Sequence, residues 1–196
     1  MPLLESNSKQ IILASKSPRR IELLKKIIDN FEVHVSDIDE NLETNDPVDF
    51  VTRLSKDKVE EVAARFTEGI LIGADSIVVL DNVILNKPAD KDDAARMLRM
   101  LSGREHKVFT GFTVLSKPGN ASVSDYDMTR VKFRHIEDWE IDKYIEVAQP
   151  FDKAGSYGIQ DESAVFVEYI QGCFYNVMGL PVTKVYRALT EIMKKE

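Results

Sequence analysis

The sequence contains very few of the residues that stabilise secreted proteins or span membranes. Cys173 is the only cysteine among 196 residues, so no internal disulfide is possible and a reducing compartment is expected. No apolar run approaches the length of a membrane-spanning helix. The first ten residues also lack the basic flank and long apolar segment of a secretory signal. We therefore expect a cytoplasmic protein with no attachment to a membrane.

The chain also has fewer positively charged residues than negatively charged ones. The chain has 26 lysines and arginines against 33 aspartates and glutamates, which gives a formal net charge of -7. A polyanion would be repelled except at a local basic site, so we expect no stable binding of nucleic acid. Hydrophobic residues make up 43% of the chain and charged residues 30%, which is typical of a folded globular protein rather than a disordered one.

Several common catalytic motifs are missing. The sequence has no G-x-x-x-x-G-K-[ST] phosphate loop, no G-x-G-x-x-G and no serine in a G-x-S-x-G elbow. Its three histidines, His34, His106 and His135, show no metal-ligand spacing, and we interpret each as a surface or strand residue. We expect Trp139 to belong to the core rather than to a base-stacking platform.

Strand and helix patterns alternate along the chain and predict an α/β fold with long, partly antiparallel strands. The predicted strands cover residues 11–14, 31–36, 70–80, 83–85, 107–115, 126–133 and 164–170. The predicted helices cover residues 18–30, 48–66, 90–103 and 137–147, and a last helix starts at Pro181. Asp81 and Asn82 are typical of a two-residue hairpin turn. No repeat or linker divides the chain, so we expect one domain over residues 1–196.

The run Ser15-Lys16-Ser17-Pro18-Arg19-Arg20 follows a predicted strand and opens a predicted helix, with Pro18 suited to its first position. Two arginines are locally unfavourable near the positive end of a helix unless an anion lies among them. Phosphate suits both the arginine fork and exposed backbone amides. The alternative is that Arg19 and Arg20 pair with carboxylates of this acidic chain.

Three further polar groups lie where a purely structural account does not place them. Lys58 falls in the middle of the apolar stripe of its predicted helix, so it either snorkels to water or is held inward by an anion. Asp75 interrupts an apolar strand and needs a cation, a metal or a functional cleft, unless backbone amides at a bulge satisfy it. The acidic corner Asp37, Asp39 and Glu40 is either a solvated turn or a source of oxygen ligands for Mg²⁺.

Taken in order, these segments resemble the motifs of the Maf family of nucleotide pyrophosphatases over nearly the whole chain. The matching segments are Ser15–Arg20, Gly73–Asp75, Lys87-Pro88, Leu101–Gly103, Asp152–Gln160 and Val177–Pro181. The resemblance implies an α/β fold of the Maf and inosine-triphosphatase-like type: an elongated mixed β-sheet flanked by helices, two lobes around a central cleft, and commonly a homodimer.

The resemblance also implies an activity. Such enzymes use a divalent metal, Mg²⁺ or Mn²⁺, to hydrolyse nucleoside triphosphates to the monophosphate and pyrophosphate. With Arg20 and Gln160, the chain resembles the pattern of the branch that acts on dTTP, UTP and modified pyrimidine nucleotides. It departs from that pattern at Ser76, where the branch usually has threonine. The alternatives are a nucleotide-sensing or partner-binding regulator of septum formation, and a pyrophosphatase of the same fold that acts on other nucleotides.

The same resemblance implies a role for each site residue. Asp75 is the expected general base, and Glu40 and Asp75 are the expected metal ligands. The expected phosphate-binding residues are Ser15, Arg19, Lys58 and Lys87. The expected residues facing the sugar and base are Arg20, Ser76 and Gln160.

Overall fold

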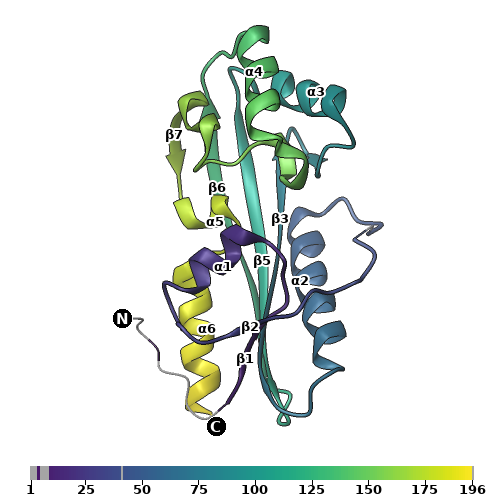
Figure 1. Cartoon of the computed structure of the whole chain (residues 1–196), viewed down its shortest axis with the longest axis vertical. Helices are drawn as coiled ribbons and strands as arrows, with labels where there is room; N and C mark the ends of the chain where they lie inside the picture. The colour runs from purple at the N-terminus through teal and green to yellow at the C-terminus, as the bar shows by residue number, and fades with distance from the viewer. Residues whose placement is uncertain (1–3, 5–8, 41, 196) are drawn as a thin grey trace. The chain divides into compact units, whose positions relative to one another are not determined.

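The computed structural model describes residues 4, 9–40 and 42–195, which form a mixed seven-stranded sheet flanked by helices (Figure 1). The strand order is β2-β1-β3-β5-β6-β7, and β4 pairs with β3. The strands are β1 (Ile11–Leu13), β2 (Glu32–Val33), β3 (Gly69–Leu80), β4 (Val83–Leu85), β5 (Glu105–Lys117), β6 (Ser122–Phe133) and β7 (Val167–Gln171). The α-helices are α1 (Pro18–Leu24), α2 (Pro47–Ala63), α3 (Lys91–Leu101), α4 (Asp138–Ala148), α5 (Phe174–Met178) and α6 (Val182–Lys194). The predicted α/β class and flanked mixed sheet are confirmed.

Local turn and cap chemistry explains several of these boundaries. Asp81 and Asn82 adopt φ angles of 48° and 66° between the antiparallel strands β3 and β4, so the predicted hairpin turn is confirmed. Asp90 caps α3 by accepting a hydrogen bond from the backbone N–H of Asp93 at 2.8 Å. Asp46 caps α2 in the same way, accepting from the N–H of Val48 at 2.8 Å.

Three expectations about the elements were wrong, and one helix was missed. Helix α1 ends at Leu24 rather than near residue 30, and residues 25–27 form a turn. The strand predicted over 31–36 is only β2, an edge strand whose Val33 is exposed. The apolar run 164–170 becomes a strand only at Val167, because Asp161 starts a 3-10 helix, η3 (Glu162–Phe166). Helix α5 was not predicted at all.

The chain divides into two compact units that share strands β3, β5 and β6. The first contains residues 1–75, 110–127 and 179–196, and the second contains residues 76–109 and 128–178. Each unit has its own buried apolar residues. Within the described ranges, no helix has the length and apolar character needed to cross a lipid bilayer.

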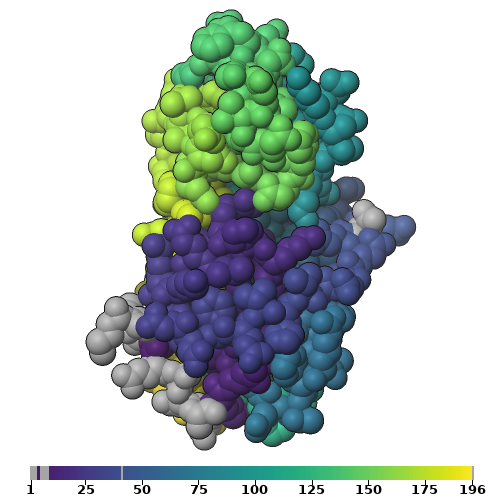
Figure 2. All heavy atoms as spheres, in the orientation of Figure 1, coloured from purple at the N-terminus to yellow at the C-terminus, as the bar shows by residue number. Residues whose placement is uncertain are grey.

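The first unit begins as an alternation of strand and helix. Strand β1 pairs in parallel with β2 on one side and with β3 on the other, and α1 and α2 supply the crossover connections. The apolar side of α2 packs on this sheet through Val59 and Val62, which cluster with Ile12 and Leu71. In Figure 2, residues 9–40 of this unit (purple) form a broad continuous surface.

An order of β2-β1-β3 places a topological switch point between β1 and β3. In sheets of this kind, ligands bind outside the carboxyl ends of the strands at such a point. Ser15 lies just beyond the end of β1, and Asp75 lies three residues beyond Ile72, the β3 partner of Leu13. The topology therefore places Ser15 beyond the carboxyl end of β1, where a ligand is expected, and Asp75 on the neighbouring strand β3.

The second unit is built around an aromatic cluster and a polar anchor. His106 lies in edge-to-face contact with Phe133 and Tyr157, and its Nε2 lies 2.7 Å from the Tyr157 hydroxyl. Burial lowers the pKa of His106 to about 3, so this histidine is neutral and structural. The interpretation of His106 as a strand residue is confirmed, because it lies in β5.

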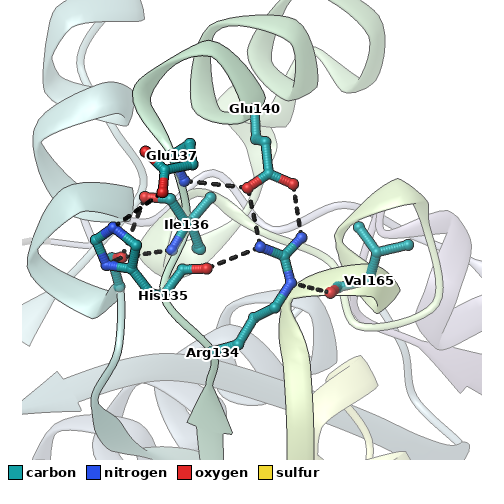
Figure 3. Close-up of polar contacts among 7 residues, drawn as sticks. Arg134, His135, Ile136, Glu137, Glu140 and Val165 are labelled. Carbon is teal, nitrogen blue, oxygen red and sulfur yellow. Dashed lines mark hydrogen bonds and ion pairs between the residues drawn. The ribbon is translucent and has the colours of Figure 1, made fainter.

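The anchor fixes the start of helix α4. The two terminal nitrogens of Arg134 donate to both Glu140 oxygens, at 2.9 and 2.6 Å, and its Nε donates to the Val165 carbonyl at 2.8 Å (Figure 3). Glu140 also accepts from the N–H of Glu137 at 3.0 Å, completing a capping box. This network connects β6, α4 and η3.

The placement of Trp139 in the core was wrong, because its side chain is 70% exposed. Helix α4 buries Ile141, Tyr144 and Ile145 on one face. Residues two apart on a helix lie about 200° apart around its axis, so Trp139 falls on the opposite face from Ile141.

Candidate functional site

Asp75 faces helix α2 because of its position in strand β3. Successive side chains of a strand point to opposite faces, so Leu71, Gly73 and Asp75 share one face. Leu71 packs against α2, and a Cβ on Gly73 would lie 2.6 Å from the Val59 side chain and 2.9 Å from the Ser55 carbonyl. The glycine therefore allows the helix to approach the strand closely, directly beside the carboxylate.

Lys58 comes from the facing turn of α2 and binds two carboxylates. Its Nζ lies 2.6 Å from Asp75 Oδ1 and 2.8 Å from Glu40 Oε1. The side chains of Lys58 and Asp75 are only 9% and 10% exposed, whereas that of Glu40 is 44% exposed. Lys58 does not snorkel to water, so the alternative in which an anionic group holds it inward is correct, and that group is a pair of protein carboxylates.

Arg20 lies on α1 and is held at two points. Its Nε donates to the carbonyl of Gly179 at 2.9 Å, and one of its terminal nitrogens donates to Ser15 Oγ at 3.3 Å. Ser15 Oγ also accepts from the backbone N–H of Ser17 at 3.2 Å. Pro18 occupies the first turn of α1 as predicted. Ser15 thus orients the arginine and shapes the turn in which it lies.

The electrostatic surroundings of Arg20 connect it to the two carboxylates. Loss of hydration lowers the pKa of Arg20, and the adjacent Arg19 lowers it further, while Asp75 and Glu40 act in the opposite direction. Four charged groups therefore act on one another within the first unit. Since an arginine keeps its proton far above neutral pH, the site presents fixed positive charge beside two carboxylates.

The donor set fits a magnesium-type ion better than a zinc-type one. Glu40 and Asp75 supply hard oxygen ligands that already converge on one cation, the ammonium group of Lys58. Among the described residues, no group of three or more histidine, cysteine, aspartate or glutamate side chains is placed to hold a metal. Mg²⁺ is commonly bound by one or two carboxylates together with substrate phosphates, and the pair fits that pattern.

Three of the predicted site residues belong to the second unit. Ser76 is a partly buried residue of β3, Lys87 is exposed after β4, and Gln160 is exposed in a turn. Their assigned roles stay predictions. Gly155, in the matching segment Asp152–Gln160, makes room for a side chain: a Cβ there would lie 2.7 Å from Val78.

Sequence reasoning missed two contributors to the first unit. The carbonyl of Gly179 anchors Arg20, and the segment around it was noticed only as a matching motif. Gly111 of β5 is a second point of close approach, because a Cβ there would lie 2.3 Å from the Val51 carbonyl oxygen of α2. The alternation of residues along β5 offered no signal for this contact before its neighbour in the fold was known.

Comparisons with known proteins identify the family of this chain. The family described as Maf-like protein matches residues 10–192. A dTTP/UTP pyrophosphatase of Carboxydothermus hydrogenoformans is 47% identical over 182 residues, which cover 93% of this chain and 98% of that protein. The dTTP/UTP pyrophosphatases of Clostridium botulinum (strain 657) and Clostridium perfringens (strain SM101) are 44% and 46% identical, covering 94% and 92% of this chain and 97% and 95% of theirs. The chain belongs to the Maf family.

Proposed function

We propose that this protein is a nucleoside triphosphate pyrophosphatase that hydrolyses dTTP and UTP to the monophosphate and pyrophosphate. The observation that supports this most directly is the buried contact of Lys58 with Asp75 and Glu40, beside Arg20. It combines a base, two oxygen ligands and cations in one unit. The names of relatives at 43–47% identity support the choice of dTTP and UTP.

The cations are the groups that bind the triphosphate. Arg19, Lys58 and Lys87 would neutralise its charge and stabilise the negative charge that moves toward the leaving pyrophosphate. Ser15 accepts hydrogen bonds from Ser17 and Arg20 in the structure. Its own hydroxyl would donate a hydrogen bond to a phosphate oxygen.

Asp75 is the proposed general base. It would accept a proton from the water that attacks the α-phosphorus in line with the leaving pyrophosphate. Without nucleotide, one of its oxygens accepts a hydrogen bond from Lys58, which holds the carboxylate in place before the substrate binds. Water supplies the oxygen that ends on the monophosphate, and the α–β phosphoanhydride bond breaks.

The cofactor is a divalent cation, Mg²⁺ or Mn²⁺, which Glu40 and Asp75 would hold. When bound, it would neutralise phosphate oxygens and favour the leaving of pyrophosphate. Arg20, Ser76 and Gln160 are the proposed contacts to the sugar and base, and this assignment is based on the family resemblance. We further infer that residues 1–196 act as one catalytic domain, as a homodimer in the cytoplasm.

The test is pyrophosphate release by the purified protein with Mg²⁺ or Mn²⁺ over a panel of triphosphates: dTTP, UTP, CTP, methylated pyrimidines, GTP and ITP. We expect selective release from dTTP and UTP. The variant Asp75→Asn should lose about 10²–10⁴-fold in kcat while it still binds nucleotide, because the amide keeps the shape but cannot accept the proton.

Other outcomes are equally informative. Activity on purine nucleotides or CTP alone would contradict the assigned specificity and keep the chemistry. Binding without turnover on every substrate would instead support the nucleotide-sensing alternative. Loss of binding together with turnover in Asp75→Asn would show that Asp75 chiefly holds the metal or the fold.

A further inference from the structure

Lys58 occupies the position that a catalytic metal would need. Its ammonium nitrogen lies 2.6 Å from Asp75 Oδ1 and 2.8 Å from Glu40 Oε1, and these are the two side chains proposed to hold the ion. Mg²⁺ coordinates carboxylate oxygens at about 2.0–2.1 Å. An ion bound to the same two oxygens would therefore lie against a second positive charge, which is strongly unfavourable in a site with little water.

We infer that Lys58 is a built-in substitute for the metal, and that the triphosphate draws it away from Glu40 and Asp75 so that the metal takes its place. In the free protein, Lys58 neutralises the buried Asp75 and holds Glu40 beside it. When nucleotide binds, the ammonium pairs with phosphate oxygens, and both carboxylates become available to the divalent ion. This inference rests on the proposed function.

One structural observation and two general properties of the groups support such an exchange. The two carboxylates differ in burial, since the side chain of Asp75 is 10% exposed and that of Glu40 is 44% exposed. The buried Asp75 needs a cation at all times. The more exposed Glu40 loses little stabilisation when the lysine leaves, because water solvates its charge. The four-carbon stem of lysine can move its charge while its backbone stays on α2. A triphosphate also brings more negative charge than the two carboxylates together.

The exchange makes metal binding and nucleotide binding cooperative. Free metal must displace an ammonium group that already satisfies the carboxylates, so it binds weakly alone. Once the phosphates hold the ammonium, the same carboxylates bind the metal without that competition. By linkage, metal must strengthen nucleotide binding by the same factor.

The experiment measures Mn²⁺ binding by electron paramagnetic resonance, with and without α,β-imido-dUTP, which cannot be cleaved at the scissile bond. Wild-type protein should bind Mn²⁺ weakly alone and at least about tenfold more tightly with the analogue. Without the analogue, Lys58→Met should bind Mn²⁺ about tenfold more tightly than wild type. The analogue should raise the Mn²⁺ affinity of this variant by a smaller factor than it raises that of wild type. Lys58→Arg keeps the competing charge and should resemble wild type in weak Mn²⁺ binding.

A matched control exists in the same unit. Lys184 of α6 lies between two carboxylates on the surface, 3.3 Å from Asp125 and 3.9 Å from Asp127. Lys184→Met should leave Mn²⁺ binding and its enhancement by the analogue unchanged. An equal gain in this variant would show that loss of any positive charge explains the result, and would overturn the inference.

Thermal unfolding gives a second readout that needs no turnover. Lys58→Met removes the ammonium group that contacts both carboxylates, so we expect it to be less stable than wild type and to regain stability in Mn²⁺ more than wild type does. A variant that stays unfolded in Mn²⁺, or one that binds Mn²⁺ no more tightly than wild type, would overturn the inference. Wild-type protein that fails to bind Mn²⁺ even with the analogue would instead contradict the proposed metal-dependent function.

Discussion

At the scale of single residues, Lys58 offsets the free-energy cost of burying the carboxylate of Asp75. A buried aspartate without a partner is costly, and breaking a buried ion pair by removing one member costs about 3–5 kcal/mol. Lys58 meets that need from a helix position where the pattern predicted an apolar side chain. The local departure from the apolar stripe was therefore the sign of a buried ionic contact.

Ser76 is the residue at which this chain departs from the pattern of the family branch it resembles. The variant Ser76→Thr adds one methyl group and keeps the hydroxyl. If Ser76 contacts the sugar or base as proposed, the methyl should sharpen discrimination between dTTP or UTP and CTP by about tenfold, since one carbon group in a pocket is worth about 1–3 kcal/mol. Ratios of kcat/KM for the three substrates measure it.

The control for this prediction is Ser76→Ala, which removes the hydroxyl without adding a methyl group. It should not sharpen discrimination. If Ser76→Thr changes kcat/KM equally for all three substrates, Ser76 does not face the base.

At the scale of elements, the position of helix α2 depends on glycine in two strands. Gly73 of β3 and Gly111 of β5 both allow its backbone to approach the sheet. A chain of hydroxyl contacts joins α2 to β5 and β6: Ser55 Oγ lies 3.0 Å from Thr113 Oγ1, which lies 2.8 Å from Ser124 Oγ. Together they fix the helix that presents Lys58.

Gly111→Ala should destabilise the protein by about 1–3 kcal/mol, because a Cβ only 2.3 Å from the Val51 carbonyl oxygen forces the helix and strand apart. Chemical denaturation measures the loss in free energy of unfolding. Gly119→Ala is the control, since a Cβ there meets no heavy atom within 4 Å. Equal stability of the two variants would contradict the close-approach explanation.

The hydrogen bonds at the start of helix α4 predict how the stability of the fold changes with pH. Hydrogen bonds from Arg134 and then from the N–H of Glu137 lower the pKa of Glu140 to about 2, from an ordinary value of 4.5. A lowered folded-state pKa means that the carboxylate stabilises the fold above about pH 4.5, and that this stability is lost as the pH falls toward 2. Glu140→Gln should therefore cost about 2 kcal/mol at neutral pH and progressively less below pH 4.5.

Denaturation of wild type and Glu140→Gln between pH 7 and pH 3 measures this difference. Glu146→Gln serves as the control on the same helix, because Glu146 is 67% exposed and pairs only with Lys143, at 3.0 Å, in the described structure. That change should cost less than about 0.5 kcal/mol. A difference for Glu140→Gln that does not shrink with acid would contradict the assigned cause.

At the scale of the whole molecule, nucleotide and metal should both stabilise the folded chain against unfolding, because their binding site exists only in the folded state. A ligand that binds only the folded state adds about 2.7 kcal/mol to stability at 100 times its Kd. We expect Mn²⁺ with α,β-imido-dUTP to raise the unfolding temperature more than the sum of their separate effects, and a chelator to remove the excess. A strictly additive effect would show that the two ligands bind independently.

The sequence by itself determined the α/β class, the hairpin at Asp81 and Asn82 and most of the long elements, because these depend on neighbouring residues. It was less successful where distant contacts decide. The exposure of Trp139 depends on which face of α4 is buried. The 3-10 start of the 164–170 run follows instead from the cap at Asp161, which the apolar pattern did not reveal.

For the candidate site, the sequence identified Asp75, Lys58, Glu40 and Arg20 as residues that needed an explanation, and the family motifs assigned them chemistry. Only the tertiary structure decided which of them meet. The alternation of β3 and the close approach of α2 at Gly73 bring Lys58 to Asp75, and the carbonyl of Gly179 holds Arg20 from 159 residues away. Such partners are set by packing between distant segments, which local periodicity does not encode.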